Sequence, residues 1–331
     1  MNLDGKRIII SRTDSIGDVM LTLPMCAWLK ANYPSVKITF LGKGYTRPIV
    51  ECYSLVDSYE DWNDYADLST YKQVEKLQNL EADAIIHVFP NSTIAKIAKK
   101  AKISTRVGTS HRIYHNWTCN KRPSFTRKNS DLHEAQLNHE LLRPFGLKEL
   151  PTLEEIVKTT NYFKVPKVDL PNEFKSLTDI TILHPKSQGS AKEWPIEKYF
   201  QLASNIAQRG ETVIFTGTKK EGDLFRNQLP KHDNIIDSTG KLSLEQLIVL
   251  ISKAKNLVAC STGPLHIAGY VGVNTIGLYS PKRPIHPGRW MALGPKVTIL
   301  VNDDQCQACA EKQDCFCIEE ISVNRVELVL V

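Results

Sequence analysis

The chain has 331 residues and lacks any uninterrupted apolar run of about 18–20 residues, the length needed to cross a bilayer. Its start lacks the basic segment followed by an apolar one that marks a secretory signal peptide. Short-period repeats and low-complexity tracts are missing too. We therefore expect a cytoplasmic protein with no signal peptide and no membrane span.

Nucleic-acid recognition motifs are also absent: the sequence has no zinc-finger spacing, no aromatic RNP-like motif and no long basic helix. We therefore expect no nucleic-acid partner. The charge balance is mild, with 42 Lys and Arg against 36 Asp and Glu and a net charge of +6. Such an excess favours an anionic ligand, for example a phosphorylated substrate or an acidic membrane surface.

The length and composition favour two folded domains. The chain is about twice the ~150 residues expected of one domain, and 42% of its residues are hydrophobic, enough for two cores. Residues 165–170 lie between polar segments and are the linker candidate. We predict domains at residues 1–165 and 166–331.

Strand-like and helix-like segments alternate in both halves. The segments typical of strands are residues 7–11, 37–41, 84–88, 106–108, 181–184, 212–216, 256–260 and 275–279. The segments typical of helices are residues 19–32, 93–101, 132–145, 195–209, 243–254 and 263–272, and residues 116–130 are expected to form a polar, basic loop. This alternation predicts two doubly wound α/β domains, whose parallel sheets bind ligands at the carboxyl ends of their strands.

A turn between the first strand and the next helix carries the first candidate residues, Gly17 and Asp18. The helix that follows offers its positive end to an anion. A dinucleotide-binding site would need G-x-G-x-x-G at this turn, so its absence argues against a dehydrogenase. On the residues alone, Asp18 is either a helix N-cap or an acid/base group.

Two similar turns lie in the second half. Residues 184–195 hold hydroxyl groups, a glycine and two lysines, which suit a diphosphate but also fit a solvated loop. Residues 260–266 place Pro264 in the first turn of a helix and leave N–H groups free for a phosphate, although the hydroxyl groups there also fit simple helix caps. Both turns would share one crevice.

Several segments together resemble glycosyltransferase family 9, the heptosyltransferases that build the inner core of bacterial lipopolysaccharide. They follow the family's order through both halves and read RTDSIGD at residues 12–18, TLP at 22–24, KEWP at 192–195, KLSLE at 241–245 and STGPLH at 261–266. The resemblance implies a GT-B fold, in which two Rossmann-like domains face a central cleft. It also implies an inverting, metal-independent transfer of a heptose from a nucleotide diphosphate donor, usually ADP-heptose, with no cofactor.

The resemblance also assigns roles to the two domains. The N-terminal domain would bind the acceptor, a lipopolysaccharide core or similar glycan, and the C-terminal domain would bind the nucleotide-sugar. Closure of the domains would bring the reacting groups together. An enzyme of this kind works in the cytoplasm, in peripheral contact with the inner membrane.

Individual residues take roles by matching the family's motifs. Asp18 matches the carboxylate that deprotonates the acceptor hydroxyl, and Lys192 matches the lysine that neutralises the leaving diphosphate. Glu221 is matched to the acidic residue that binds the donor ribose, and Leu242 to an apolar residue beside the base. The other donor-binding candidates are Ser187, Ser261, Thr262, Gly263, Pro264, Leu265 and His266.

Two departures from the family pattern leave the substrates open. Ser261 stands where characterised heptosyltransferases often have an aspartate that helps to place the donor sugar. The basic loop has no known acceptor motif, so its cations either meet an acidic acceptor by charge or are solvated surface. These cations are Lys121, Arg122, Arg127 and Lys128. The alternatives are a same-fold transferase that uses a UDP-sugar for another surface glycan, and a non-catalytic sugar-nucleotide-binding protein.

The eight cysteines fall into two groups. Four are scattered and are expected to be reduced thiols: Cys26, Cys52, Cys119 and Cys260. The other four lie in one short segment whose tight spacing suits a tetrahedral zinc site: Cys306, Cys309, Cys315 and Cys317. Reduced thiols with no bound metal are the expectation here, and structural zinc and disulfide pairing are the alternatives.

Overall fold

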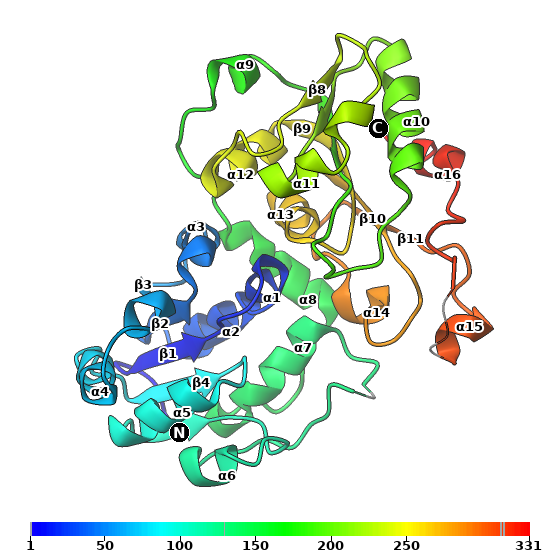
Figure 1. Ribbon diagram of the computed structural model, residues 1–331. Coiled ribbons are helices and arrows are strands. Elements are labelled where there is room, and N and C mark those ends of the chain that lie inside the picture. Colours follow the sequence, from blue (N-terminus) through cyan, green and yellow to red (C-terminus); the bar gives the residue numbers. More distant parts are fainter. Residues whose placement is uncertain (1, 129, 312, 314) are drawn as a thin grey trace. The chain divides into compact units, whose positions relative to one another are not determined.

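The computed structural model describes residues 2–128, 130–311, 313 and 315–331. The chain separates into two compact units, Met1–Lys164 and Val165–Val331, whereas the sequence put the boundary after residue 165. Figure 1 shows the first unit from blue to green and the second from green to red. Each unit contains one sheet with helices around it.

The sheet of unit 1 is fully parallel and has the strand order β3-β2-β1-β4-β5. Its central strands are short β-branched runs that are buried on both faces, as parallel sheets require. The order reverses between β1 and β4, which lie side by side. The strands are β1 (Arg7–Ser11), β2 (Lys37–Gly42), β3 (Ser58–Asp61), β4 (Ala84–His87) and β5 (Thr105–Val107).

Helices cover this sheet and complete its core. Ile94 and Ile97 of α5 pack with Ile9, Leu41 and Ile85 of the strands. The helices, with η for 3-10 turns, are α1 (Ile16–Met20), α2 (Pro24–Asn32), η1 (Gly44–Thr46), α3 (Arg47–Glu51), η2 (Trp62–Tyr65), α4 (Thr70–Gln78), α5 (Ser92–Lys100), α6 (His115–Thr118), α7 (Glu134–His139), η3 (Glu140–Phe145), α8 (Leu153–Lys158) and η4 (Thr159–Tyr162).

Unit 2 has a second fully parallel sheet, with the strand order β11-β10-β9-β6-β7-β8. Its order reverses between β6 and β9, which is the arrangement of a dinucleotide-type doubly wound sheet. The predicted parallel, doubly wound class is therefore confirmed for both units. The strands are β6 (Ile180–His184), β7 (Val213–Phe215), β8 (Ile235–Asp237), β9 (Ala254–Cys260), β10 (Asn274–Leu278) and β11 (Val297–Leu300).

The helices of unit 2 lie on both faces of its sheet. α12 packs with α13 on one face, and α10 packs with α16 on the other (Figure 1). Trp194, just before α10, and Tyr199, within α10, are both buried in the core of this unit. The helices are α9 (Asn172–Lys175), α10 (Ile196–Gln208), α11 (Lys219–Asp223), η5 (Arg226–Gln228), α12 (Leu244–Ser252), α13 (Gly263–Val271), α14 (Pro287–Trp290), α15 (Gln307–Ala310) and α16 (Val323–Glu327).

Some predicted elements are wrong in detail. The single helix expected at residues 19–32 is two helices, α1 and α2, because Pro24 has no N–H to continue the first and instead begins the second. Residues 132–145 form α7 and then a 3-10 turn that contains Pro144. The expected loop at 116–130 begins within α6. Within the described ranges, none of the helices combines the length and apolar character that spanning a bilayer requires.

Candidate functional site

Both sheets place candidate residues at the point where the strand order reverses. In unit 1, Asp18 follows β1, the strand that pairs with β4. In unit 2, the loop at residues 185–195 follows β6, and the turn at 261–262 follows the adjacent β9. Neighbouring parallel strands leave a crevice outside their carboxyl ends at such a reversal, which is where ligands bind in doubly wound sheets.

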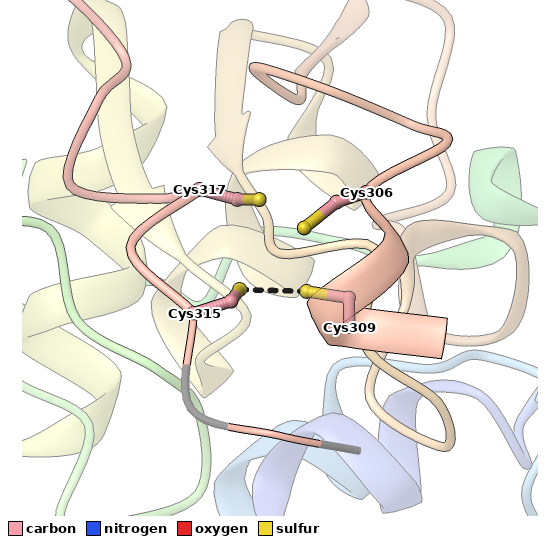
Figure 2. A group of neighbouring side chains, drawn as sticks. All are labelled: Cys306, Cys309, Cys315 and Cys317. Atoms are coloured by element: carbon pink, nitrogen blue, oxygen red, sulfur yellow. Dashed lines mark hydrogen bonds between the residues drawn. The ribbon is translucent and has the colours of Figure 1, made fainter. Parts of the chain in front are cut away.

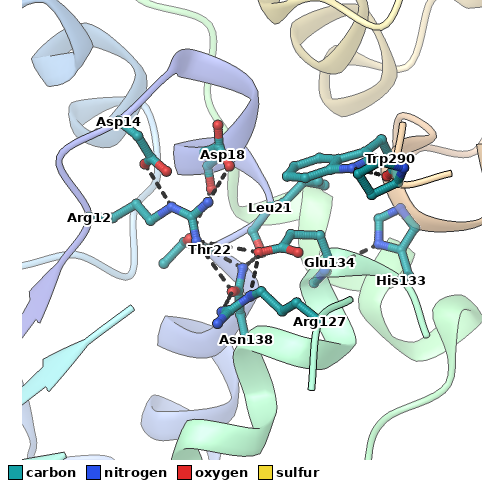
Figure 3. A network of polar contacts seen from close by, with 12 residues as sticks. Arg12, Asp14, Asp18, Leu21, Thr22, Arg127, His133, Glu134, Asn138 and Trp290 are labelled. Atoms are coloured by element: carbon teal, nitrogen blue, oxygen red, sulfur yellow. Dashed lines mark hydrogen bonds and ion pairs between the residues drawn. The ribbon is translucent and has the colours of Figure 1, made fainter. Parts of the chain in front are cut away.

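A buried arginine organises the end of β1. The Arg12 side chain is 4% exposed, and its guanidinium forms ion pairs with three carboxylates (Figure 3). Its Nε lies 2.7 Å from Oδ1 of Asp14, and its Nη1 lies 3.5 Å from Oε1 of Glu134. Its Nη2 donates to Oδ1 of Asp18. The fixed fork of the guanidinium therefore holds carboxylates from two distant segments in one place.

Burial and neighbouring charges shift the pKa of Arg12 and the pKa of Asp14. Burial alone lowers the pKa of Arg12, but the attraction of Asp14, Asp18 and Glu134 outweighs burial and raises it. Burial raises the pKa of Asp14 to about 6, and the nearby Asp18 charge adds to the rise while Arg12 opposes it. A carboxyl group that titrates this close to neutrality is a feature of functional sites.

Asp18 does not act as a helix N-cap, one of the two roles that the sequence left open. Ser15 is the N-cap of α1, and Asp18 is the third residue of that helix. The Ser15 hydroxyl donates to Oδ2 of Asp18 over 2.5 Å, and the Thr22 hydroxyl donates to its backbone carbonyl over 2.9 Å. Both carboxylate oxygens thus have a donor, which fixes the direction of the side chain.

The network continues into α7. Arg127 lies 3.0 Å from Oε1 of Glu134 and donates to Oδ1 of Asn138 over 3.0 Å, while the amide of Asn138 donates to the Leu21 carbonyl (Figure 3). Arg127 is one of the loop cations predicted to contact the acceptor, and the structure joins its guanidinium to the network around Asp18. Sequence reasoning assigned no role to four members of this network: Arg12, Asp14, Glu134 and Asn138.

The other three loop cations lie apart from this network. Lys121 forms a β-bridge with Val107, and the Arg122 guanidinium donates to the side chain of Asn116 over 2.9 Å. The Lys128 backbone N–H donates to the Thr126 hydroxyl, and the residue is exposed. These three stay candidates for acceptor contacts by charge alone.

Uncharged polar groups are buried where β1 and β4 end. Within the described ranges, Oγ of Ser11, both ring nitrogens of His87 and Nε2 of His115 are buried without a hydrogen-bond partner. The two imidazoles stack with their centroids 5.8 Å apart, and burial lowers the pKa of His87 to about 3. Burial also lowers the pKa of His115, so both rings are neutral near pH 7. The Nδ1 of His115 donates to the Thr109 carbonyl over 2.8 Å, which leaves its Nε2 as a hydrogen-bond acceptor.

In unit 2, Glu193 organises the loop after β6. Its Oε1 accepts from the N–H of Ser187 over 2.7 Å and from the Ser187 hydroxyl over 3.0 Å. Its Oε2 pairs with the Lys186 ammonium over 2.9 Å. Lys192 is not part of this cluster and donates to the backbone carbonyl of Cys315 over 2.6 Å. The ammonium of Lys192 has three donors, so two remain for a ligand.

The start of α13 has the features of an anion site. Thr262 is its N-cap but makes no side-chain capping bond, and its hydroxyl is buried without a partner, with 6% of the residue exposed. Pro264 occupies the first turn, and Gly263 and Leu265 supply N–H groups that no earlier turn of the helix can satisfy. The first N–H groups of α13 and the Thr262 hydroxyl can thus donate hydrogen bonds to a bound anion.

The remaining donor candidates surround this turn. The Ser261 side chain forms a hydrogen bond with the side chain of Tyr279. His266 is buried within α13. One carboxylate oxygen of Glu221 accepts from the Thr218 N–H over 2.6 Å in a capping box of α11. Leu242 is half-buried just before the predicted capping box of α12, which the structure contains.

Comparisons with known proteins give a consistent picture. The model of the family described as glycosyltransferase family 9 (heptosyltransferase) matches residues 70–318. The lipopolysaccharide core heptosyltransferase OpsX of Haemophilus influenzae is 24% identical over 324 residues, which cover 91% of this chain and 86% of that protein.

Two solved structures share the fold. The glycosyl transferase family 9 structure from Veillonella parvula is 22% identical with a TM-score of 0.76, and the alignment covers 99% of this chain and 97% of that one. The E. coli heptosyltransferase WaaC with ADP is 17% identical with a TM-score of 0.74, over 97% and 98% of the two chains. Both identify the two units as the halves of a GT-B fold.

The raised pKa of Asp14 predicts a pH-dependent stability. Because the folded protein holds this proton more tightly than the unfolded chain does, stability falls as the pH rises from the ordinary pKa near 4 to about 6. Asp14→Asn removes the titration and keeps an oxygen acceptor for Arg12. We expect the melting temperature of the variant, relative to the natural protein, to rise between pH 5 and pH 7.5 by the equivalent of about 1–2 kcal/mol.

Asp57→Asn is the control, because this carboxylate has a pKa shift of opposite sign. Burial raises its pKa, but hydrogen bonds from Lys30 and from the Ile38 N–H lower it overall. The stabilising effect of the Asp57 carboxylate is complete above its ordinary pKa near 4. The difference in melting temperature between Asp57→Asn and the natural protein should therefore be the same at pH 5 and at pH 7.5. A level difference for Asp14→Asn as well would contradict the raised pKa. Calorimetric scans at the two pH values decide.

Proposed function

This chain belongs to glycosyltransferase family 9, the heptosyltransferase family, and we propose that it is an inverting, metal-independent heptosyltransferase. It would move a heptose or a related sugar from a nucleotide diphosphate donor, ADP-heptose first, to a lipopolysaccharide core or similar glycan. Unit 2 would bind the donor and unit 1 the acceptor. The solved structure of the E. coli heptosyltransferase WaaC with ADP supports the choice of an adenine nucleotide as the first donor to test.

One observation carries the donor side of this proposal. The Thr262 hydroxyl is buried without a partner at the start of α13, where the strand order of unit 2 reverses. A phosphate oxygen there would accept from Thr262 and from the first N–H groups of the helix, and the positive helix end would stabilise its charge. Lys192, on the neighbouring loop, would supply a full positive charge to the diphosphate.

The proposed reaction is a single displacement. The Asp18 carboxylate takes the proton from the acceptor hydroxyl as its oxygen attacks the anomeric carbon of the donor sugar. The bond from that carbon to the diphosphate breaks, and the nucleoside diphosphate leaves with the electron pair. Attack from the face opposite the leaving group inverts the anomeric centre. Lys192 and the start of α13 would stabilise the negative charge that grows on the diphosphate.

A neutral residue supports a second candidate for the donor sugar. Ser261 bonds to Tyr279 and offers no carboxylate to the sugar, unlike the aspartate that the family often has at this place. A donor whose sugar differs from heptose, including a UDP-sugar for another surface glycan, fits this change. Thermal stabilisation by a panel of ADP- and UDP-sugars separates the two candidates, because only a ligand of the folded state raises the melting temperature.

The donor side predicts an effect of Lys192→Ala. Loss of one charge-assisted hydrogen bond, about 1.5–3 kcal/mol, should weaken ADP binding about 10- to 100-fold and slow transfer, with the fold intact. Lys198→Ala is the control, because Lys198 of α10 also donates to backbone carbonyls of the C-terminal segment, those of Glu319 and Ile321. Calorimetry should find ADP affinity near normal in the control. Equal affinity in both variants would overturn the role of Lys192.

The acceptor side predicts an effect of Asp18→Asn. The amide keeps the shape and an acceptor for Arg12 but cannot take the proton, so turnover should fall ~10²–10⁴-fold with donor affinity little changed. Asp14→Asn removes the same charge from the same arginine. It should cost far less turnover if the effect belongs to proton transfer rather than to the charge of the network.

Turnover and melting temperature are measured on both variants. Full activity of Asp18→Asn would exclude the general-base role. If the natural protein binds ADP but transfers no sugar from any donor in the panel, the non-catalytic binding protein becomes the better description.

A further inference from the structure

Four cysteine side chains converge near the C-terminal end of unit 2. Cys306 and Cys309 lie at the start of and within α15, and Cys315 and Cys317 lie on the extended segment that follows (Figure 2). Their four sulfur atoms all lie within 4.8 Å of one another. Figure 2 shows the two pairs facing each other, with all four side chains directed into one small space.

The cluster has the dimensions of a tetrathiolate metal site. Four sulfurs at ~2.3 Å from a central ion are ~3.8 Å apart. The four sulfurs here all lie within 4.8 Å of one another, and the Cys309 and Cys315 sulfurs, 2.6 Å apart, would separate by ~1 Å around an ion. The ligand set C-x2-C with C-x-C supplies one sulfur from each of four residues on two facing segments. Tetrahedral sites with four sulfur ligands select zinc or iron.

Apolar burial contributes little around the four cysteines. The buried side chains at its centre are the cysteines themselves, and the cluster adds only Cys306 and Ala308 as half-buried neighbours. Cys309, Cys315 and Cys317 are each at most 5% exposed. A centre this small gives little hydrophobic stabilisation, and short segments of this kind are ordinarily held by metals or disulfides.

The surroundings suit a negatively charged metal centre. Four thiolates around a divalent ion carry a net charge of −2, which needs nearby donors and cations. The Ser280 hydroxyl lies 3.5 Å from the Cys309 sulfur. Lys192 donates to the Cys315 carbonyl over 2.6 Å, and Lys282 donates to the Gln313 carbonyl over 3.1 Å. Two lysine ammonium groups thus form hydrogen bonds with backbone carbonyls of the cysteine segment.

We propose that Cys306, Cys309, Cys315 and Cys317 bind one zinc or iron ion in a structural site. The sequence alone favoured separate reduced thiols without a metal, and the convergence of the four sulfurs replaces that expectation. A disulfide between Cys309 and Cys315, whose sulfurs lie 2.6 Å apart, would leave the half-buried Cys306 and the buried Cys317 beside it without a function. A metal ion uses all four.

The proposed metal site also affects the loop that carries Lys192. This second inference rests on the proposed function, because it assumes that Lys192 binds the donor. The Cys315 carbonyl, between two proposed ligands, receives the Lys192 ammonium that would neutralise the diphosphate. The ion would fix this carbonyl, and the carbonyl would fix the lysine. Loss of the ion should therefore weaken binding of the nucleotide-sugar, although every residue that contacts it is still present. The metal site would position Lys192 and would take no part in the chemical step.

The first test is metal analysis of the full chain, purified without chelator or added reductant. We expect about one zinc or iron per chain that survives dialysis, and iron tetrathiolates are distinguished by visible absorption because zinc has none. Thiol titration after denaturation should return all eight cysteines as thiols. Metal content near zero, or a titration that returns six thiols or fewer, would overturn the proposal.

Variants give the matched comparison. Cys306→Ser, at the most exposed of the four positions, should lose most of the bound ion, whereas Cys119→Ser, at a scattered buried thiol of unit 1, should keep it. Equal metal content in the two variants would contradict the assignment. If Cys306→Ser fails to fold, stripping the natural protein with a strong chelator and restoring zinc or iron tests the same point through its melting temperature, which should fall and then recover.

ADP affinity separates this proposal from the proposed function. Calorimetry on the stripped and the restored protein should show affinity about 10-fold weaker without the ion. A bound ion with unchanged ADP affinity would leave the metal site standing and overturn its link to Lys192. A chain that holds the ion but binds no nucleotide at all would overturn the proposed donor rather than the metal site.

Discussion

The pairing of β6 with β9 is the constraint on which the donor site depends. These strands are far apart in sequence, and their register, from Thr181 opposite Asn256 to His184 opposite Ala259, brings both carboxyl ends to one edge. The fully buried Asn256 reinforces it at the other end: its amide donates to Thr181 and to the Val331 carbonyl, and its oxygen accepts from Asn274. A one-residue slip would separate the Lys192 loop from the start of α13 and leave this amide unsatisfied.

In unit 1 the corresponding constraint is electrostatic. A buried guanidinium needs carboxylates around it, since an unpaired charge at that depth costs several kcal/mol. Arg12 meets this need with Asp14 and Asp18 from its own turn and Glu134 from α7. The orientation of Asp18 is therefore set by a charge that must be neutralised, and burial beside this charge raises the pKa of Asp14. The same contacts that stabilise the fold orient the carboxylate that we propose as the general base.

The sequence predicted the parts of the fold that local patterns encode. Buried β-branched runs gave the central strands β1, β4, β6 and β9, and the capping box at Ser243 gave the start of α12. It missed β3, β8 and β11, because edge strands are short or mixed in polarity: β3 reads SYED and β8 only IID. It joined α1 and α2 because periodicity continues across Pro24, where backbone chemistry does not.

In the candidate site, too, the sequence indicated the residues in local turns but not the contacts between distant segments. The turns at Asp18, Lys192 and Thr262 were found because glycine, proline and hydroxyl residues mark strand-to-helix turns. The contact of Arg12 with Asn138 spans 126 residues and that of Lys192 with Cys315 spans 123, and a window of ten or twenty residues carries no sign of either. Convergence of the four cysteines likewise depends on how α15 and the following segment face each other.

If the cysteines bind an ion, the cysteine segment and the donor loop would let a metal serve a transfer whose proposed chemistry does not use it. The Cys315 carbonyl is a neutral acceptor that takes one donor of the Lys192 ammonium and leaves its charge intact for a diphosphate. A carboxylate in that position would neutralise the lysine, as Glu193 does for Lys186 within the same loop. A flexible carbonyl would leave the long side chain mobile, and ordering it would then reduce the affinity for the donor. A rigid, uncharged anchor is the arrangement that holds the ammonium in place without weakening it, and a tetrathiolate site at the side chain of the same cysteine would supply the rigidity.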